Sequence, residues 1–125
     1  TMDSISLEKK HSVKLSSGFV FDSSILESKT KEFLATLKLV FGDSWSRVLK
    51  KKTIRAGIGK MRGRKYRSNA GLLFVIGNDE KMKRSGIEVV SVKDIAIKDL
   101  SPNGEPGRIT CYTEQAIKDI EVRFK

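Results

Sequence analysis

Apolar residues recur along the chain in short blocks that predict alternating strands and helices. The block at 71–77 reads Gly-Leu-Leu-Phe-Val-Ile-Gly, and a continuous apolar run of this kind between glycines is typical of a strand buried on both faces of a parallel sheet. Shorter runs at 18–22, 88–92 and 108–112 are rich in β-branched and aromatic residues and predict three further strands.

Apolar residues spaced by three and four positions predict a helix over 28–41. We expect Ser28 or Thr30 to cap its start, with Glu32 in the first turn, and Gly42 to end it. The residues expected to face the core form one stripe: Phe33, Leu34, Leu37 and Val40 or Phe41.

Two further helices are predicted by their capping residues. Asp43 and Ser44 are suited to cap a short helix that carries Trp45 toward the core, where we expect the indole to pack rather than to stack on a base. Thr113 is expected to cap a closing helix, with Glu114 favourable at its positive end. The inward residues of that helix are expected to be Ala116, Ile117 and Ile120.

The remaining segments complete the expected organisation. Residues 78–84 are polar and predict one or two helical turns, 93–100 predict a short helix or a strand, and 101–107 predict a loop dense in turn formers. Strands that alternate with helices predict an α/β fold, in three layers, with a mostly parallel sheet flanked by helices. We expect one domain over 18–125, preceded at 1–17 by a tail or by a segment of cloning origin.

Positive charge is concentrated in one window of this 125-residue chain. The net charge is +10, and no acidic residue occurs between Asp43 and Asp79. The remaining 15 basic residues balance the 15 acidic ones, so the whole excess lies at 47–67. One sign of charge without relief costs stability and is expected where a polyanion supplies the missing charge. The ten basic residues are Arg47, Lys50, Lys51, Lys52, Arg55, Lys60, Arg62, Arg64, Lys65 and Arg67.

The second half of this window contains three glycines, which disfavour a helix and predict an extended, basic glycine-rich loop with an exposed backbone. Gly57 and Gly59 would let main-chain N–H groups approach phosphate oxygens closely. Tyr66, flanked by Lys65 and Arg67, offers a flat face to a base or ribose. We expect no membrane partner, because the window lacks the apolar face of a membrane-surface helix and no stretch approaches the roughly 20 apolar residues of a span.

Other kinds of chemistry have little support in the sequence. Gly57, Gly59 and Gly63 are spaced one residue wider than a dinucleotide fingerprint, and Met61 stands where a P-loop would carry Ser or Thr. Cys111 and His11 are the only cysteine and histidine, so we expect no disulfide and no zinc site, and neither a Ser-His-Asp nor a Cys-His centre is favoured. We expect no cofactor.

Three motifs in the same order resemble one known family. They are Arg-Ala-Gly-Ile-Gly-Lys-Met-Arg-Gly-Arg-Lys-Tyr-Arg at 55–67, Gly-Ile-Glu-Val-Val-Ser-Val-Lys-Asp at 86–94, and the stretch from Pro102 to Glu114. Together they resemble the large-subunit ribosomal protein L-four family in its archaeal and eukaryotic form, over about residues 18 to 120. The resemblance implies a non-enzymatic constituent of the cytoplasmic ribosome that binds large-subunit rRNA and adjoins neighbouring ribosomal proteins.

The chain departs from that family in three ways. Asn103 and Glu105 replace a more usual Gly and His, so we expect that turn to differ in conformation or contacts. Ile58 stands where the family usually has another lysine, which would slightly weaken the loop as an RNA ligand. The family's amino-terminal half has no counterpart in residues 1–17. The resemblance therefore implies a truncated form, a reduced member, or one piece of a split protein whose second polypeptide supplies that half.

The RNA-binding residues expected from the window are its ten basic residues together with Gly57, Gly59 and Tyr66. Arg108 is a weaker candidate, with a solvent-facing position at a strand start as the alternative. Two other functions remain open. One is a small nucleotide-dependent or nucleic-acid-processing enzyme on a doubly wound sheet, for which Asp43 and Asp79 are the bracketing carboxylates. The other is a basic module that binds an acidic protein.

Overall fold

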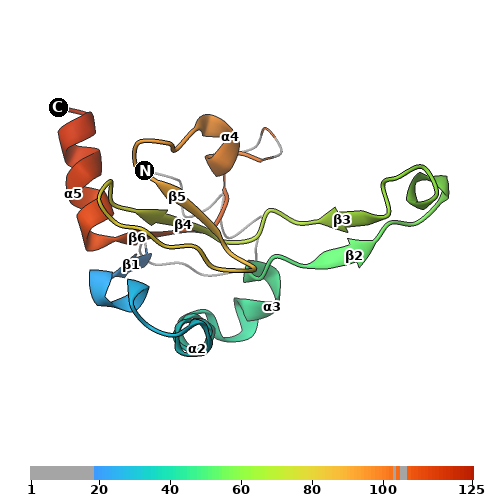
Figure 1. Ribbon diagram of the computed structural model, residues 1–125, viewed down its shortest axis with the longest axis horizontal. Coiled ribbons are helices and arrows are strands. Elements are labelled where there is room, and N and C mark those ends of the chain that lie inside the picture. The colour runs from blue at the N-terminus through green and yellow to red at the C-terminus, as the bar shows by residue number, and fades with distance from the viewer. Residues whose placement is uncertain (1–18, 103, 105–106) are drawn as a thin grey trace.

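A computed structural model describes residues 19–102, 104 and 107–125 of the chain (Figure 1). The predicted tail at 1–17, His11, Gly18 of the first predicted strand, and positions 103, 105 and 106 of the predicted loop lie outside the described residues.

A four-stranded sheet forms the centre of the molecule, and neighbouring strands in it are all parallel. In sheet order the strands are β1 (Phe19–Phe21), β6 (Thr110–Thr113), β4 (Leu73–Ile76) and β5 (Glu88–Ser91). Each of the four strands predicted from apolar runs is therefore confirmed. Every residue of β4 is buried, as its unbroken apolar run predicts.

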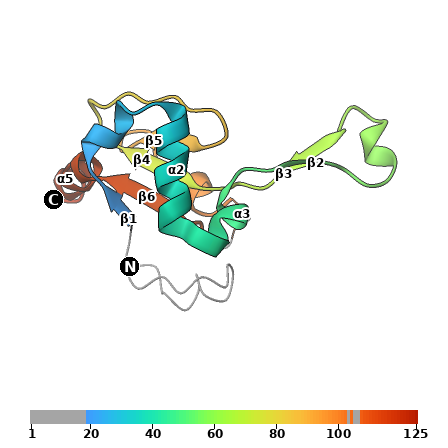
Figure 2. The same ribbon diagram turned by 90° about the horizontal axis from the view of Figure 1, so that it is seen from below.

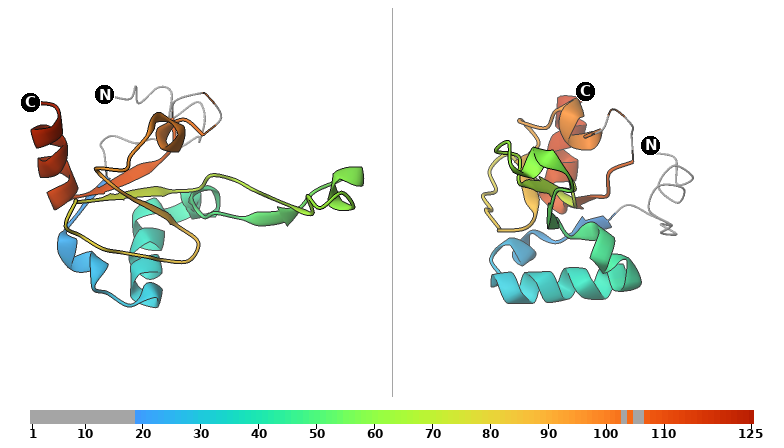
Figure 3. Two further views of the ribbon diagram at one scale, coloured as in Figure 1. Left: turned by 45° about the horizontal axis from the view of Figure 1, so that its top comes forward. Right: turned by 90° about the vertical axis from the view of Figure 1, so that its right-hand side faces the viewer.

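Helices cover both faces of this sheet (Figure 1; Figure 3, right). On one face lie α2 (Thr30–Phe41) and α3 (Trp45–Val48), and on the other lie α4 (Ile97–Leu100) and α5 (Glu114–Arg123). Short 3-10 turns η1 (Ser23–Leu26) and η2 (Gly42–Ser44) flank α2. The arrangement confirms the predicted three-layer α/β fold.

The two faces of β4 belong to two separate clusters of buried side chains. Phe74 packs edge-to-face on Phe33 of α2, with ring centroids 5.5 Å apart. Leu73 and Val75 point to the opposite face and pack with Ala116 of α5. Because successive side chains of a strand alternate between faces, one apolar run supports both helical layers. The larger cluster also includes Leu37, Phe41, Val48, Leu72, Ile76 and Cys111, with Trp45 and Leu34 packed against it.

Helix α2 begins differently from the prediction. Its N-cap residue is Lys29, whose N–H donates to the Glu32 carboxylate at 3.3 Å. The two predicted caps are wrong because their hydroxyls bind elsewhere: Ser28 Oγ donates to the Ile25 carbonyl, and Thr30 Oγ1 accepts from Arg84. The end is as predicted, at Gly42 with φ 48°.

The predicted helical turns at 78–84 are also wrong, because this segment is irregular. Carboxylates bind the backbone N–H groups where this segment begins: Glu80 accepts a hydrogen bond from the Gly77 N–H, and Asp119 accepts one from the Asn78 N–H, both at 2.7 Å. Arg84 then donates to the carbonyls of residues 26 and 28 and holds the segment against the start of α2. These long-range partners outweigh local helix formation.

The shorter helices differ in how they are capped. Thr113 Oγ1 accepts from the Ala116 N–H at 3.1 Å, which confirms the predicted cap of α5. The predicted side-chain cap from Asp43 or Ser44 is wrong, because these residues lie in the 3-10 turn η2 between α2 and α3 and Ser44 makes no capping bond. Of the alternatives for 93–100, the helix is observed, as α4.

Candidate nucleic-acid interface

A two-stranded hairpin projects from the sheet domain and contains most of the basic window (Figures 1 and 2). Strand β2 (Lys52–Ile54) pairs antiparallel with β3 (Tyr66–Ser68), and the 3-10 turn η3 (Ile58–Lys60) lies at the far end. We call residues 50–69 the arm. Every residue of the arm is exposed except Gly59, which is partly buried.

The hairpin replaces the predicted extended loop. Cross-strand bonds continue beyond the two strands, since the Arg55 N–H donates to the Lys65 carbonyl at 2.9 Å. The glycines are placed where the chain reverses: Gly57 has φ 78° and Gly63 has φ 75°, a region that side chains disfavour. Strand formation was missed because the sequence is dominated by its charges and glycines, whereas the β-forming residues Thr53, Ile54 and Tyr66 are few.

Hydrogen bonds at the base of the arm fix where it leaves the domain. Asn69 Oδ1 accepts from the Lys51 N–H at 2.6 Å, and Asn69 Nδ2 donates to the Leu49 carbonyl at 3.0 Å. Gly71 has φ 66°, and a Cβ there would lie 3.0 Å from the Lys50 nitrogen. The two limbs approach closely at this point, and the positive φ also disfavours a side chain, so glycine is favoured there. Nothing in the sequence pattern pointed to Asn69.

Arg108 joins this base to the sheet and to α4. Its side chain donates to the carbonyls of Ala70 at 2.9 Å, Gly71 at 3.0 Å and Asp99 at 2.7 Å. It also forms an ion pair with Glu88 at 2.6 Å. Arg108 is 6% exposed, so the alternative of a solvent-facing position at the strand start is wrong. Because its guanidinium N–H groups donate to groups within the domain, Arg108 is a poorer candidate for RNA contact than the exposed residues of the arm.

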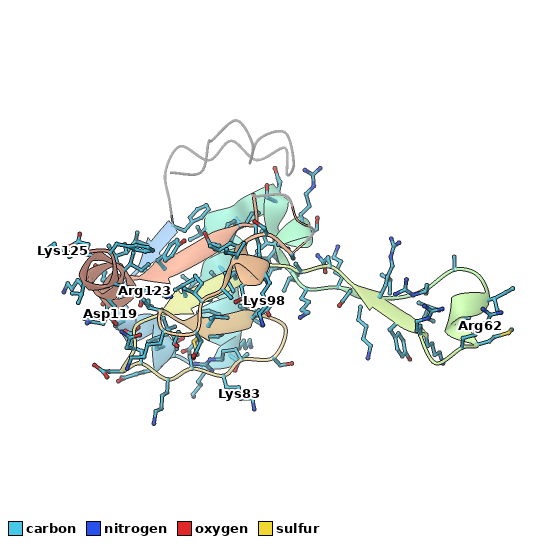
Figure 4. The ribbon with its side chains drawn as sticks, turned by 90° about the horizontal axis from the view of Figure 1, so that it is seen from above. Arg62, Lys83, Lys98, Asp119, Arg123 and Lys125 are labelled. Carbon is cyan, nitrogen blue, oxygen red and sulfur yellow. The ribbon has the colours of Figure 1, made fainter. Side chains whose placement is uncertain are left out.

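All the site residues predicted from sequence lie in the arm or at its base. Arg47 is in α3 and lines, with Val48 and Ala70, a cavity of about 270 Å³ beside the base. Arg62 lies near the far end of the arm (Figure 4). Among the described residues, the nine basic side chains from Lys50 to Arg67 form no ion pair with a carboxylate. The remaining predicted residues are spread along both limbs between the base and the far end of the arm: Lys51, Lys52, Arg55, Gly57, Gly59, Lys60, Arg64, Lys65 and Tyr66.

The strand register gives the arm two different faces. Ile54 lies opposite Tyr66 on one face, while Thr53 lies opposite Arg67 on the other. The Lys52 ammonium stands 4.2 Å from the centre of the Tyr66 ring, and the Lys65 ammonium stands 5.7 Å away. Pairing of Lys52 with Tyr66 depends on the hairpin register and was not visible in the sequence.

The end of the sheet formed by the carboxyl ends of its strands, where open α/β folds bind nucleotides, is the end opposite the arm (Figure 1). Its carboxylate Glu80 is occupied by structural bonds, including one from Thr113 Oγ1 at 2.7 Å. Of the bracketing carboxylates, Asp79 follows β4 at this far edge, whereas Asp43 lies in η2. Neither joins the basic residues of the arm in a common centre.

The described part of the chain offers little for other chemistry. It contains no group of three or more His, Cys, Asp and Glu residues able to hold a metal ion. Burial raises the pKa of the Cys111 thiol, which disfavours the reactive thiolate. No described helix is long and apolar enough to cross a membrane.

Comparison with known proteins identifies relatives of one kind, although no family model matches the chain. The large ribosomal subunit protein uL4 of Saccharolobus solfataricus is 40% identical over 103 residues, covering 78% of this chain. The uL4 protein of Methanocaldococcus jannaschii is 37% identical over 113 residues, or 85% of the chain. That of Haloquadratum walsbyi is 46% identical over 76 residues.

This chain belongs to the uL4 family. The match confirms the resemblance seen in the three sequence motifs. The chain covers only 38% of the Saccharolobus protein and 45% of the Methanocaldococcus protein, so it corresponds to less than half the length of these uL4 relatives.

Proposed function

We propose that this uL4-family chain is a non-enzymatic component of the large ribosomal subunit that binds rRNA through its arm. The observation that carries the proposal is the gathering of the excess positive charge on an exposed, projecting hairpin whose nine basic side chains have no carboxylate partner among the described residues. RNA phosphates would supply the missing negative charge and would offset the repulsion within the arm.

The geometry of the arm suits a phosphate backbone. Basic side chains arise from both limbs and from the tip, so an RNA strand running along the arm would meet a cation at short intervals. The four arginines beyond β2 can each bridge two phosphate oxygens, because the guanidinium is planar. Gly57 leaves its backbone exposed at the tip, while Gly59 beside it is partly buried. Tyr66 offers an aromatic surface to a base or ribose.

The chosen partners follow from the family and from the position of the arm. The relatives are named as large ribosomal subunit proteins. Their names support large-subunit rRNA and neighbouring ribosomal proteins as the partners of this chain, and the cytoplasmic ribosome as its location. A second polypeptide that carries the remainder of the family's length is a further proposed partner, and its strand would add at β1 or β5, the two edges of the described sheet. Co-purification with tagged chain from native ribosomes tests that partner.

The decisive experiment measures binding to large-subunit rRNA fragments across a salt series. In the test variant, Arg55, Arg62, Arg64 and Arg67 are changed to Ala. If each arginine neutralises one phosphate, the slope of log affinity against log salt should flatten by about 3, at roughly 0.7 to 0.9 per contact. A matched variant removes four exposed charges outside the arm, by changing Lys31, Lys83, Lys93 and Lys118 to Ala.

The control should leave the slope nearly unchanged. Equal flattening in both variants would indicate diffuse attraction and would contradict binding through the arm. A competing acidic peptide of equal charge separates RNA from an acidic protein partner, because an RNA-binding arm should retain structured RNA at moderate salt. Preference for the peptide would favour the protein-binding alternative.

A further inference from the structure

The tip of the arm exposes large apolar side chains among its charges. Ile58 is 66% exposed and Met61 is 81% exposed, although both lie in a segment that contacts no part of the described core. Exposed apolar residues are common singly, but here two occur together at the point farthest from the domain (Figures 1 and 4). They belong to neither buried cluster of the described residues, so both side chains are accessible to a partner.

The backbone of the tip holds these two side chains together. Ile58 begins η3, and its carbonyl accepts from the Met61 N–H at 3.0 Å. In a 3-10 turn, side chains three residues apart lie on the same side. The Gly59 carbonyl accepts from the N–H groups of Arg62 and Arg64 at 3.3 and 3.2 Å, so the return of the chain is also bonded. Ile58 and Met61 therefore form one small apolar surface on an ordered turn.

The surroundings of this surface select the partner. Lys60, Arg62 and Arg64 stand beside it, and the described residues place no carboxylate against them. A partner that matches this surface must present an apolar group directly beside its own regularly spaced negative charges. RNA meets both conditions where a base is unstacked, because the base face is apolar and its own phosphate is adjacent. In a continuous duplex the base faces are covered by stacking.

We propose that Ile58 and Met61 pack against an unstacked base of the bound RNA, while the neighbouring cations hold its phosphates. The proposal rests on the proposed function of the arm and adds a preference for non-helical RNA. Apolar side chains inserted at base steps are a known way for proteins to use distorted nucleic acid. The contact is not electrostatic, so it adds affinity without adding salt dependence.

The test substitutes Ile58 by Lys, because binding by charge alone and packing on a base then predict opposite changes in RNA affinity. If the arm acts by charge alone, Ile58→Lys adds a phosphate contact, tightens binding and steepens the salt slope by about 0.7 to 0.9. If Ile58 packs on a base, binding to an rRNA fragment with unpaired nucleotides should weaken about tenfold despite the added charge. Leu39→Lys is the matched control, because Leu39 is 85% exposed on α2, away from the arm.

Met61→Ala should weaken the same complex by about threefold to tenfold, and Leu39→Ala should not weaken it. Met61→Ala should bind a fully paired duplex of equal length as the unchanged chain does, and Ile58→Lys should bind that duplex no more weakly than the unchanged chain. Tighter binding by Ile58→Lys, or equal losses on the two RNAs, would overturn the proposal. If the arginine variant still flattens the slope in that case, only the base contact fails. If it does not, the proposed function fails as well.

Discussion

The sheet domain and the arm of this chain are built from opposite kinds of residues. In the domain, β4 is wholly buried and supports apolar clusters on both sides of the sheet. In the arm, every residue but Gly59 is exposed, and the side chains are mainly basic. The domain therefore owes its stability to apolar burial, whereas the arm owes its shape to backbone bonds and to its attachment.

This difference indicates how the two regions divide the work of binding. A two-stranded hairpin is marginally stable alone, and repulsion among like charges weakens it further. The arm is oriented by contacts at its junction with the domain: the Asn69 bonds, the close approach at Gly71 and the buried Arg108. The domain thus fixes the direction in which the charged hairpin projects from the sheet.

The largest expected effect concerns the core. Phe74→Ala removes a fully buried ring that packs on Phe21 and Phe33, and should lower the free energy of unfolding by about 3–5 kcal/mol in urea denaturation. Met61→Ala, the matched change in the arm, should lower it by less than about 0.5 kcal/mol. Similar losses in both variants would contradict the division between a core-stabilised domain and an arm outside that core.

The next largest effect is expected at the junction. Arg108→Met keeps an apolar stem but leaves the carbonyls of Ala70, Gly71 and Asp99 without their buried donor. We expect a loss of about 2–3 kcal/mol in the free energy of unfolding, together with faster amide exchange at the base of the arm. RNA affinity should fall while the salt slope stays the same. A flatter slope would instead mean that Arg108 itself contacts phosphate.

A smaller effect is expected from Asn69→Ala, which removes the bonds to Lys51 and Leu49. Local opening at the base should become easier by about 1 kcal/mol, read as faster exchange of the Lys51 amide. Ser68→Ala, on the adjacent exposed residue, is the control. Equal exchange rates in the two variants would show that Asn69 does not hold the limbs together.

The smallest effect is a pH dependence that belongs to the domain alone. Burial by itself raises the pKa of Glu80, but hydrogen bonds from Ser23, Thr113 and the Gly77 N–H outweigh it and hold the pKa below 4.5. The folded pKa lies below the unfolded value, so this carboxylate stabilises the fold above about pH 4.5 and ceases to do so as pH falls through the folded pKa. Glu80→Gln should shrink the loss of stability in acid, and identical acid profiles would contradict this role.

Much of the domain could be predicted from the sequence because its apolar pattern is strong and local. The buried strand, the stripe of Phe33 and Leu37, and the Thr113 cap each depend on residues close together in the chain. The predictions failed at 78–84 and at the start of α2, where Asp119 and Arg84 reach across from distant positions. Such partners compete with local propensity and leave no periodic signal.

By itself, the sequence determined the α/β layering, the single-sign charge window and the family resemblance, since composition, periodicity and motifs are properties of the chain. Only the tertiary structure decided that the window is a hairpin, that Lys52 covers Tyr66, and that Arg108 is buried at the base of the arm. Strand register and burial depend on which distant segments meet. The packing of the whole domain sets those meetings, and no local pattern encodes them.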